Sequence, residues 1–561
     1  MAERSLAKIT EVDAAAIAAL IARAEKQLEA NDHALLKGIC ESFVQLQKLV
    51  RQKGTTIARL RRLVGITSSE KSADVLKGND VGEAVGEASN TASGDDDDAA
   101  DADGQDKPEK KKKGHGRISA AAYPGAEHIP VAHETLCPKD CCPACAKGTL
   151  YRMKEPVQFV RIIGQAPLCA VCFDLEQLRC SACGKVFTAR APPQAQGKKF
   201  SDTAASMLAL LRYGIGLPLN RLGCLQSWLQ IPVPTSTQWD VAHERVEDVG
   251  PVHAELLRLA AQGSVVHNDD TFVRILQFMG KRRAELLRQG KLEHQERTGL
   301  FTTAIVAVNE QRLIAAFFSG RKHAGENLTM LFAQREAERS PPLLMSDALE
   351  RNLPKHVKVD WANCLAHGRR GVVDEIENFP AECEHIIKEL AIVFAVDARA
   401  KRERLSASDR LRLHQEDSRP VMDRLEAWLG ALDAQKRIEP NSGMGMAINY
   451  LLKRWQRFCR FLEVPGAPLD NNIAERALKM AIRHTNASLF YKTLRGAAVG
   501  DIYMTLIHTA VLHSENPFHY LTALFAHAPD VASKPAAWLP WNYRHTIATR
   551  DAISNAEQSS H

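Results

Sequence analysis

The chain has 561 residues, more than a single hydrophobic core usually organises, so we expect several domains. Its 45% hydrophobic and 25% charged residues are ordinary for a soluble globular protein. No apolar run reaches the roughly eighteen residues of a membrane-spanning helix, and the N-terminus lacks the apolar core of a secretory signal, so we expect a cytoplasmic protein without a membrane partner.

The net charge of +6 is unevenly distributed along the chain. Residues 1–106 contain 13 Lys and Arg against 19 Asp and Glu, a balance of −6, which leaves +12 for the remainder. A positive surplus of this size favours a polyanionic partner.

Residues 1–66 are predicted to form a coiled coil that mediates self-association. Two sets of apolar residues follow a seven-residue repeat: Leu36, Phe43, Val50, Ile57 and Val64 in the first set, and Ile39, Leu46 and Leu60 in the second. Lys53 interrupts the second set, and Gly38 and Gly54 weaken the helix, so we expect a short seam. The alternative is an amphipathic helix that packs on its own chain.

Residues 67–116 are predicted to form a disordered linker that is first acidic and then basic. Residues 79–106 contain no Lys or Arg, and their run of aspartates repels itself. The basic part that follows contains Lys110, Lys111, Lys112 and Lys113, with Arg117 just beyond it. Two interpretations stay open: a solvated tail, or a segment that lies along DNA phosphates or enters a minor groove.

Residues 117–192 are predicted to form a zinc-binding module that recognises DNA. Eight of the thirteen cysteines lie in this region, and such clustering in a reducing compartment favours metal over disulfides. Two Cys-x-x-Cys pairs flank a β-rich segment in the layout of a zinc ribbon: Cys142, Cys145, Cys180 and Cys183. Four thiolates satisfy a tetrahedral ion completely, so the predicted Zn²⁺ is structural.

Another Cys-x-x-Cys pair, Cys169 and Cys172, stands in an apolar run, where cysteine behaves as a small hydrophobic residue. We interpret the pair as packing residues. The alternative is a second zinc ion with Cys137 and Cys141 as its other ligands.

Residues 193–262 are predicted to be helical. The segments NRLGCLQSWLQ and TSTQWDVAHERVEDV, separated by IPVP, predict a helix, a short turn and a second helix. This arrangement is compatible with a DNA-binding helix-turn-helix. A plain helical connector is an equal alternative, because nothing in the segment identifies base contacts.

Residues 263–370 are predicted to form the first part of an α/β core. The segments SVVHNDDTF, LFTTAIVAV and RLIAAFFS predict three successive strands, PPLLMSDAL predicts a fourth that ends on Asp347, and HVKVDW predicts a fifth. Three consecutive strands followed by strands that alternate with helices are typical of an RNase H-like fold. In that fold, acidic residues of the first and fourth strands approach one another.

The first strand offers Asp269 and Asp270, and neighbouring side chains on a strand point to opposite faces, so they cannot both serve one site. The spacing alone does not select one of them. The alternative role for Asp347 is that of a turn residue after a strand.

Residues 468–515 are predicted to contain a helix with the third acidic candidate. Asp470 or Asn471 caps its first turn, and apolar residues recur at helical spacing. Glu475 shares a face with Lys479, so a solvated ion pair is the alternative interpretation of this residue.

Three converging carboxylates in a basic protein have a specific chemical use. Carboxylate oxygens are ligands that Mg²⁺ prefers, and two such ions can stabilise the attacking and leaving oxygens of a displacement at phosphorus. Without a cation the carboxylates would repel one another and raise one another's pKa.

Residues 371–467 are predicted to form a charged helical insertion within the core, and residues 516–561 a C-terminal segment. The insertion either reaches DNA ends or a second subunit, or forms a solvated helical bundle. The sequence does not decide between these roles.

Taken together, these segments resemble the transposases of the insertion-sequence 66 family over most of the chain. The resemblance rests on the N-terminal zipper, the GHGR before the zinc motif, CPAC with LRCSACG, LLRYGIGLPLNRL, IPVPTSTQW, HNDDT, the SDA after the fourth strand, CLAHGRR and PLDNNIAERAL. In two places the chain departs from the usual family pattern: Asp269-Asp270-Thr271 stands where Asp-Glu-Thr is usual, and Arg483-His484-Thr485 stands where Arg-Lys-Asn is usual. The second departure leaves open how the basic residues of this region contact DNA.

The resemblance implies a DNA transposase of a bacterial insertion sequence, located at the nucleoid, in which Asp269, Asp347 and Glu475 hold two Mg²⁺ or Mn²⁺ ions. It implies supporting roles for Asn471, Asn472 and Arg476, which match the family pattern around Glu475. It also implies DNA partners, namely the terminal repeats of the element and the target, a homo-oligomer, and accessory proteins of the same element.

Cys364 and His367 also match the family pattern, and we interpret them as packing residues. Two rival functions remain at this point: a DNA-binding regulator with an inactive core, and a metal-dependent nuclease that cuts without joining.

Overall fold

The structure is a computed structural model. It describes residues 186–559 except residue 436, residues 130–179 except residues 132–134, 146, 154–160 and 163, and short helical pieces between residues 21 and 40. Several predicted features lie outside the described residues, so the predictions made for them stay predictions. They are the coiled coil apart from those helical pieces, the linker with its lysines, Arg117, Cys180 and Cys183. Among the described helices, none combines the length and apolar character that crossing a bilayer requires.

The chain divides into two compact units, one of residues 82–167 and one of residues 1–81 and 168–561. In the smaller unit, an isolated β-bridge joins Cys141 to Thr149, and the backbone N–H of Cys142 donates to the carbonyl of Gly148 at 2.7 Å. These contacts close a tight turn around the pair Cys142 and Cys145.

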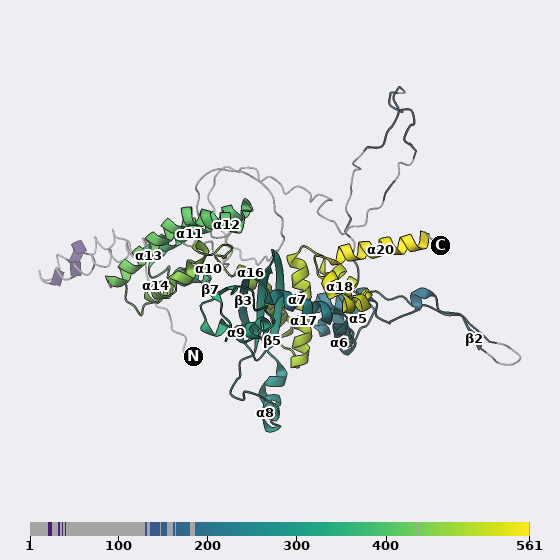
Figure 1. Ribbon diagram of the computed structural model, residues 1–561, viewed down its shortest axis with the longest axis horizontal. Coiled ribbons are helices and arrows are strands. Elements are labelled where there is room, and N and C mark those ends of the chain that lie inside the picture. The colour runs from purple at the N-terminus through teal and green to yellow at the C-terminus, as the bar shows by residue number, and fades with distance from the viewer. Residues whose placement is uncertain are drawn as a thin grey trace. The chain divides into compact units, whose positions relative to one another are not determined.

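A five-stranded mixed sheet lies at the centre of the larger unit (Figure 1). Its strands, in the order β5-β4-β3-β6-β7, are β5 (Arg312–Gly320), β4 (Phe301–Asn309), β3 (Val265–Phe272), β6 (Leu343–Ser346) and β7 (Asp360–Asn363). The first three pair antiparallel, while β6 runs parallel to β3 and β7 parallel to β6. Both faces of β4 are buried, as expected for its nearly continuous apolar and β-branched sequence.

The five predicted strands are therefore confirmed, with one shift. The fifth strand begins at Asp360, at the end of the segment predicted for it. Val357 and Val359, whose alternation suggested a strand, instead pack against the main core as partly buried residues of a loop. A further small sheet pairs β1 (Gln177–Arg179) with β2 (Val186–Thr188).

Helices surround the sheet. Those before it are α4 (Asp202–Ala209), α5 (Leu219–Trp228), α6 (Thr235–Glu244) and α7 (Val246–Ala261). Those between its strands and directly after it are α8 (Gly280–Arg288), α9 (Ala324–Phe332) and α10 (Leu365–Val373). Those at the end of the chain are α16 (Asn472–Ser488), α17 (Leu494–Leu512), α18 (Pro517–Ala526), α19 (Ala528–Ser533) and α20 (Tyr543–Ser559). The first predicted helix and the turn after it are thus confirmed as secondary structure, whereas the second predicted helix, residues 235–249, is divided at Arg245 between α6 and α7.

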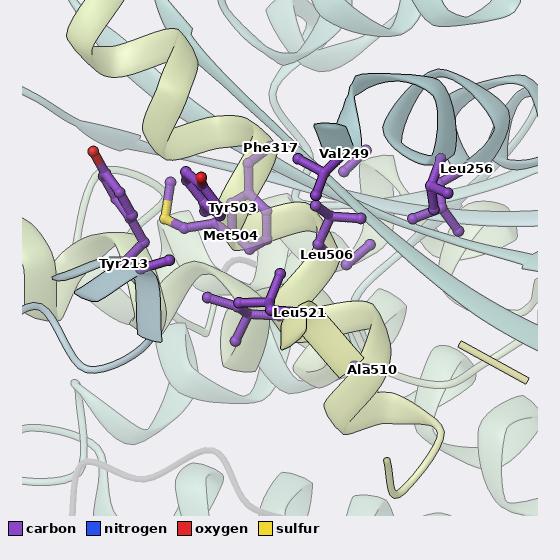
Figure 2. Close-up of a cluster of buried hydrophobic side chains, with 14 of the residues drawn as sticks. Tyr213, Val249, Leu256, Phe317, Tyr503, Met504, Leu506, Ala510 and Leu521 are labelled. Carbon is purple, nitrogen blue, oxygen red and sulfur yellow. The ribbon is translucent and has the colours of Figure 1, made fainter. Parts of the chain in front are cut away.

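One hydrophobic core joins the sheet to helices from both ends of the chain. Figure 2 shows Val249 of α7, Phe317 of β5, Tyr503 and Leu506 of α17 and Leu521 of α18 together in this core. Each of these side chains is at most 1% exposed. The helices that precede the sheet and those that follow α16 are thus packed on it as one body.

Helix α17 covers the open edge of the sheet. Along β5, the backbone N–H groups of Ala315, Phe317 and Ser319 donate to Thr509, Thr505 and Asp501 at 3.2, 3.1 and 2.7 Å. The donors are two residues apart on β5 and the acceptors four residues apart on α17. These spacings agree because two residues of a strand and four residues of a helix both advance about 6–7 Å. Side chains of α17 thus satisfy the groups that a further strand would otherwise pair with.

The helical insertion contains α11 (Pro380–Arg402), α12 (Ala407–Leu413), α13 (Arg419–Ala434), α14 (Gly443–Lys453) and α15 (Trp455–Phe458). Its apolar residues share a second hydrophobic cluster with β6 and β7, through Leu343, Met345 and Ala362. The insertion, predicted from sequence to be helical, is therefore anchored on the side of the sheet that ends in β7 (Figure 1).

Candidate functional site

Two predicted site residues follow neighbouring parallel strands. The register of β3 and β6 pairs His267 with Met345, so Asp269 and Asp347 each stand two residues beyond this last pair. Because the carboxyl ends of parallel strands meet at one edge of a sheet, the two aspartates lie at the same edge.

The direction of the side chains separates Asp269 from Asp270. The carboxylate of Asp270 accepts hydrogen bonds from Thr303 Oγ1 at 2.6 Å and from the backbone N–H of Ala324, at the start of α9, at 3.0 Å. Burial raises the pKa of Asp270. Asp269 points to the other face, the one that His267 also faces, since alternate residues of a strand share a face.

The third predicted residue, Glu475, lies in the first turn of α16. Its side chain is 24% exposed, and Oε1 lies 3.7 Å from Nδ1 of His367. Glu475 is thus largely enclosed by protein, unlike the solvated helix residue that the pairing with Lys479 suggested.

Asn471 connects the start of α16 to β3. It is fully buried, its Nδ2 donates to the carbonyl of Asn268 at 2.9 Å, and its Oδ1 lies 3.2 Å from Nδ1 of His267. Burial lowers the pKa of His267 to about 4, so the imidazole is neutral near pH 7 and donates to Asn471. The amide of Asn471 therefore bonds to β3, while Asp470 accepts the hydrogen bond from the N–H of Asn472.

Asn352 extends the same network to the second aspartate. Asn268 Nδ2 donates to the carbonyl of Asn352 at 3.0 Å, and Asn352 Nδ2 donates to Asp347. One chain of buried amides thus connects the start of α16, the end of β3 and the residue that follows β6. Each of the three predicted carboxylates belongs to one of these elements, although their oxygens do not all lie within 4.8 Å of one another. We call the predicted set of Asp269, Asp347 and Glu475 the acidic site.

The proposed supporting residues differ in position. Asn471 is buried and Asn472 half-buried, whereas Arg476 is exposed on α16. His484, where the family pattern usually has Lys, is 1% exposed and stacks on Tyr491 with 4.5 Å between ring centroids. Burial lowers the pKa of His484 to about 3, so this position adds a neutral core residue to the helix and no cation for DNA.

Two residues that the sequence analysis interpreted as packing residues are neighbours of Glu475. Cys364, at the start of α10, and His367, within it, offer ligand atoms that lie with a Glu475 oxygen within 4.8 Å of one another. The sulfur of Cys364 accepts a hydrogen bond from the N–H of Asn471 at 3.2 Å, and burial raises the pKa of the thiol. The sequence signal was present in CLAHGRR, but the position of Glu475 became evident only in the fold.

A basic projection was also missed. Between β3 and β4 the chain leaves the sheet and forms α8, which projects from the body of the unit (Figure 1). Lys281, Arg282 and Arg288 of α8 are exposed. The signal was the highly charged segment of residues 273–299, which lies between two predicted strands.

Of the four predicted zinc ligands, the structure describes Cys142 and Cys145, which lie in one short turn. Hydrogen bonds from the backbone of Lys147 and Gly148, and from Cys142, lower the pKa of the exposed Cys145. Donors aimed at a sulfur favour its thiolate form, the form that binds zinc.

Comparison with known proteins agrees with the resemblance seen in the sequence. The family model described as "Transposase IS66 family" matches residues 198–499, which include β3, β6 and α16. An uncharacterized protein of Sinorhizobium fredii, y4jD, is 25% identical over 459 residues, covering 78% of this chain and 86% of its own length. A second, y4hP, is 24% identical over 435 residues, covering 73% and 75% of the two chains.

Proposed function

Since the chain belongs to the insertion-sequence 66 family of transposases, we propose that it binds the ends of its element, hydrolyses the 3′ ends and joins them to target DNA at the acidic site. The observation that carries this proposal is the bond from Asn471 to Asn268. It holds the first turn of α16, with Glu475, beside the strand that bears Asp269.

The topology supports the same assignment. A sheet of three antiparallel strands extended by two parallel ones is the strand arrangement of an RNase H-like core. Asp269 belongs to the first strand, Asp347 follows the fourth and Glu475 belongs to a later helix, which supports the proposal. We therefore propose an RNase H-like core of the DDE type.

The donor set suits Mg²⁺ or Mn²⁺. Three carboxylates offer hard oxygen ligands, and Asn352 already donates to one of them and fixes its orientation. When bound, a pair of such ions would supply charge stabilisation for the attacking and leaving oxygens of phosphodiester cleavage. The chain's own part is positional: Asn352 orients Asp347, and Asn471 with His267 holds the helix of Glu475.

Several basic parts would bind the DNA. We propose that α8 contacts phosphates together with Lys110–Lys113 and Arg117, and that the zinc module of Cys142, Cys145, Cys180 and Cys183 contributes to recognition of the ends. The two-helix segment α5–α6 is a further candidate for contacts with the ends. Joining requires paired ends, which a homo-oligomer formed through residues 1–66 would bring together, with accessory proteins of the element as further partners.

The test uses full-length protein, a labelled duplex carrying the element's own ends, and accessory proteins of the element. Strand cleavage and joining are measured with Mg²⁺ and without it, for the wild type and for Glu475→Gln. We expect metal-dependent joined products that disappear in the variant while DNA binding persists. Lys479→Gln, one turn further along α16, is the matched control and should give both the cleaved and the joined products.

The outcomes separate the rival functions. Binding with no cleavage by the wild type would indicate a DNA-binding regulator, and cleavage without joined products would indicate a nuclease. Equal cleavage by the wild type and Glu475→Gln would refute the acidic site.

A further inference from the structure

We propose that Cys364, His367 and Glu475 form a second metal site, for a thiophilic divalent ion such as Zn²⁺, which takes Glu475 away from the Mg²⁺ ligand set. This inference rests on the proposed function, because it assigns Glu475 to the acidic site. It predicts a transposase whose activity falls when zinc becomes available.

The three side chains converge from two elements. Sγ of Cys364, a ring nitrogen of His367 and a carboxylate oxygen of Glu475 lie within 4.8 Å of one another, and the nitrogen and oxygen are 3.7 Å apart. Ligands that share a tetrahedral zinc ion lie roughly 3.5 Å apart, given Zn–S of about 2.3 Å and Zn–N of about 2.0 Å. Side-chain rotations that move the three ligand atoms by about 1 Å would therefore bring them to the separations of a tetrahedral zinc site.

Two further observations point to an ion at this position. The Nδ1 atom of His367 is buried and has no hydrogen-bond partner, a condition that costs free energy unless a ligand satisfies it. Burial keeps the pKa of the Cys364 thiol raised, so the free side chain is protonated, but its sulfur accepts backbone N–H donors from Asn471 and His367. These donors would stabilise the thiolate once an ion had displaced its proton.

The composition of this set separates it from the acidic site. Thiolate and imidazole favour Zn²⁺, whereas carboxylates alone favour Mg²⁺. Glu475 is common to both sets, so a zinc ion on Cys364 and His367 competes with catalytic Mg²⁺ for this carboxylate. The three protein ligands would leave a fourth zinc position to water.

The first experiment detects the thiolate ligand directly. Full-length metal-free protein is titrated with Co²⁺ as a probe, and the near-ultraviolet thiolate-to-cobalt absorption is compared with that of Cys364→Ser. The matched control is Cys383→Ser, because Cys383 is also buried, its thiol donates to the carbonyl of Val372, and it does not belong to the group of Cys364, His367 and Glu475. We expect a difference band between the wild type and Cys364→Ser and none for Cys383→Ser, with thermal unfolding showing that both variants are folded.

The second experiment tests competition. Strand cleavage is measured at fixed Mg²⁺ with increasing Zn²⁺, and each protein is scaled to its own zinc-free activity. We expect half-inhibition of Cys364→Ser to require at least about tenfold more Zn²⁺ than that of the wild type or Cys383→Ser. Identical zinc sensitivity of the wild type and Cys364→Ser would overturn the competition, and the absence of a cobalt difference band would overturn the site.

Failure here is distinguishable from failure of the proposed function. Mg²⁺-dependent joining without a cobalt band at Cys364 would leave the transposase assignment intact and refute the second site. A cobalt band at Cys364 in a protein that never cleaves DNA would support the metal ligands and refute the competition.

Discussion

Replacing Asn471 with alanine should weaken both the fold and catalysis. The side chain is fully buried and makes two hydrogen bonds to β3, one from its amide to the carbonyl of Asn268 and one with the ring of His267. Alanine would leave both partners buried without these bonds, and each unsatisfied group costs about 1–3 kcal/mol. The free energy of unfolding should therefore fall by about 2–6 kcal/mol.

Asn471 is a positioning residue, so its loss should lower strand cleavage by about 10–100-fold, as for other residues that orient metal ligands. Urea denaturation measures the first effect, and cleavage of the labelled duplex at a temperature where the variant is folded measures the second. The control is Asn441→Ala, since Asn441 is exposed and bonds to the neighbouring Glu439, and its effect should stay within about 0.5 kcal/mol. Wild-type stability and cleavage in Asn471→Ala would refute the reasoning.

Three other predictions follow from described contacts. Asp269→Asn should reduce cleavage more than about 100-fold with little change in stability. Asp270→Asn should mainly lower the melting temperature, because Asp270 accepts a hydrogen bond from the N–H of Ala324 at the start of α9. The reverse pattern would exchange the roles of the two residues. Burial raises the pKa of Asp501 from 3.8 to about 7, so the contribution of this group to stability is fully present below pH 3.8 and is lost as pH rises through 7. Measured by urea denaturation, the free energy of unfolding should be about 3 kcal/mol lower at about pH 8 than at about pH 5 because of this group. Asp501→Asn should abolish that difference. Replacing Lys281 and Arg282 of α8 with Glu should weaken DNA binding equally for all sequences and reduce the slope of log affinity against log salt by about 2, and an unchanged slope would remove α8 from the DNA surface.

The strands of the sheet were predictable because the residue pattern that indicates each strand lies within that strand. β3, β4, β5 and β6 are each a short run of β-branched and apolar residues bounded by turns. Their arrangement in the sheet was inferred from the succession of three consecutive strands and then strands that alternate with helices. The alternation of side chains along the strand did not select Asp269 or Asp270, and only the family resemblance favoured Asp269. The hydrogen bonds that Asp270 accepts from Thr303 and Ala324 show that Asp270 is the residue that faces α9.

The parts that escaped prediction depend on contacts between distant residues. The sequence predicted that Asp470 or Asn471 caps the first turn of α16. Asp470 accepts a hydrogen bond from the N–H of Asn472, whereas the amide of Asn471 bonds to a strand residue 203 positions away. Cys364 and His367 were interpreted as packing residues because a single Cys-x-x-His has no partner pair in the sequence. Their neighbour Glu475 comes from beyond the entire helical insertion, so no spacing rule could have connected them.

The helix that covers the edge of the sheet has a consequence for synthesis of the protein. Ala315 and Thr509, which bond to each other, are 194 residues apart. At about 5–20 residues per second, translation of that interval takes about 10–40 s, during which β4 and β5 can pair while the edge of β5 stays uncovered. A ribosome-bound chain in this interval presents a bare β-edge, so protein released before residue 501 should aggregate or require a chaperone. Synthesis of α17 is therefore expected to decide whether the edge of β5 stays available for aggregation, and we expect a stop codon before residue 501 to yield an aggregation-prone protein.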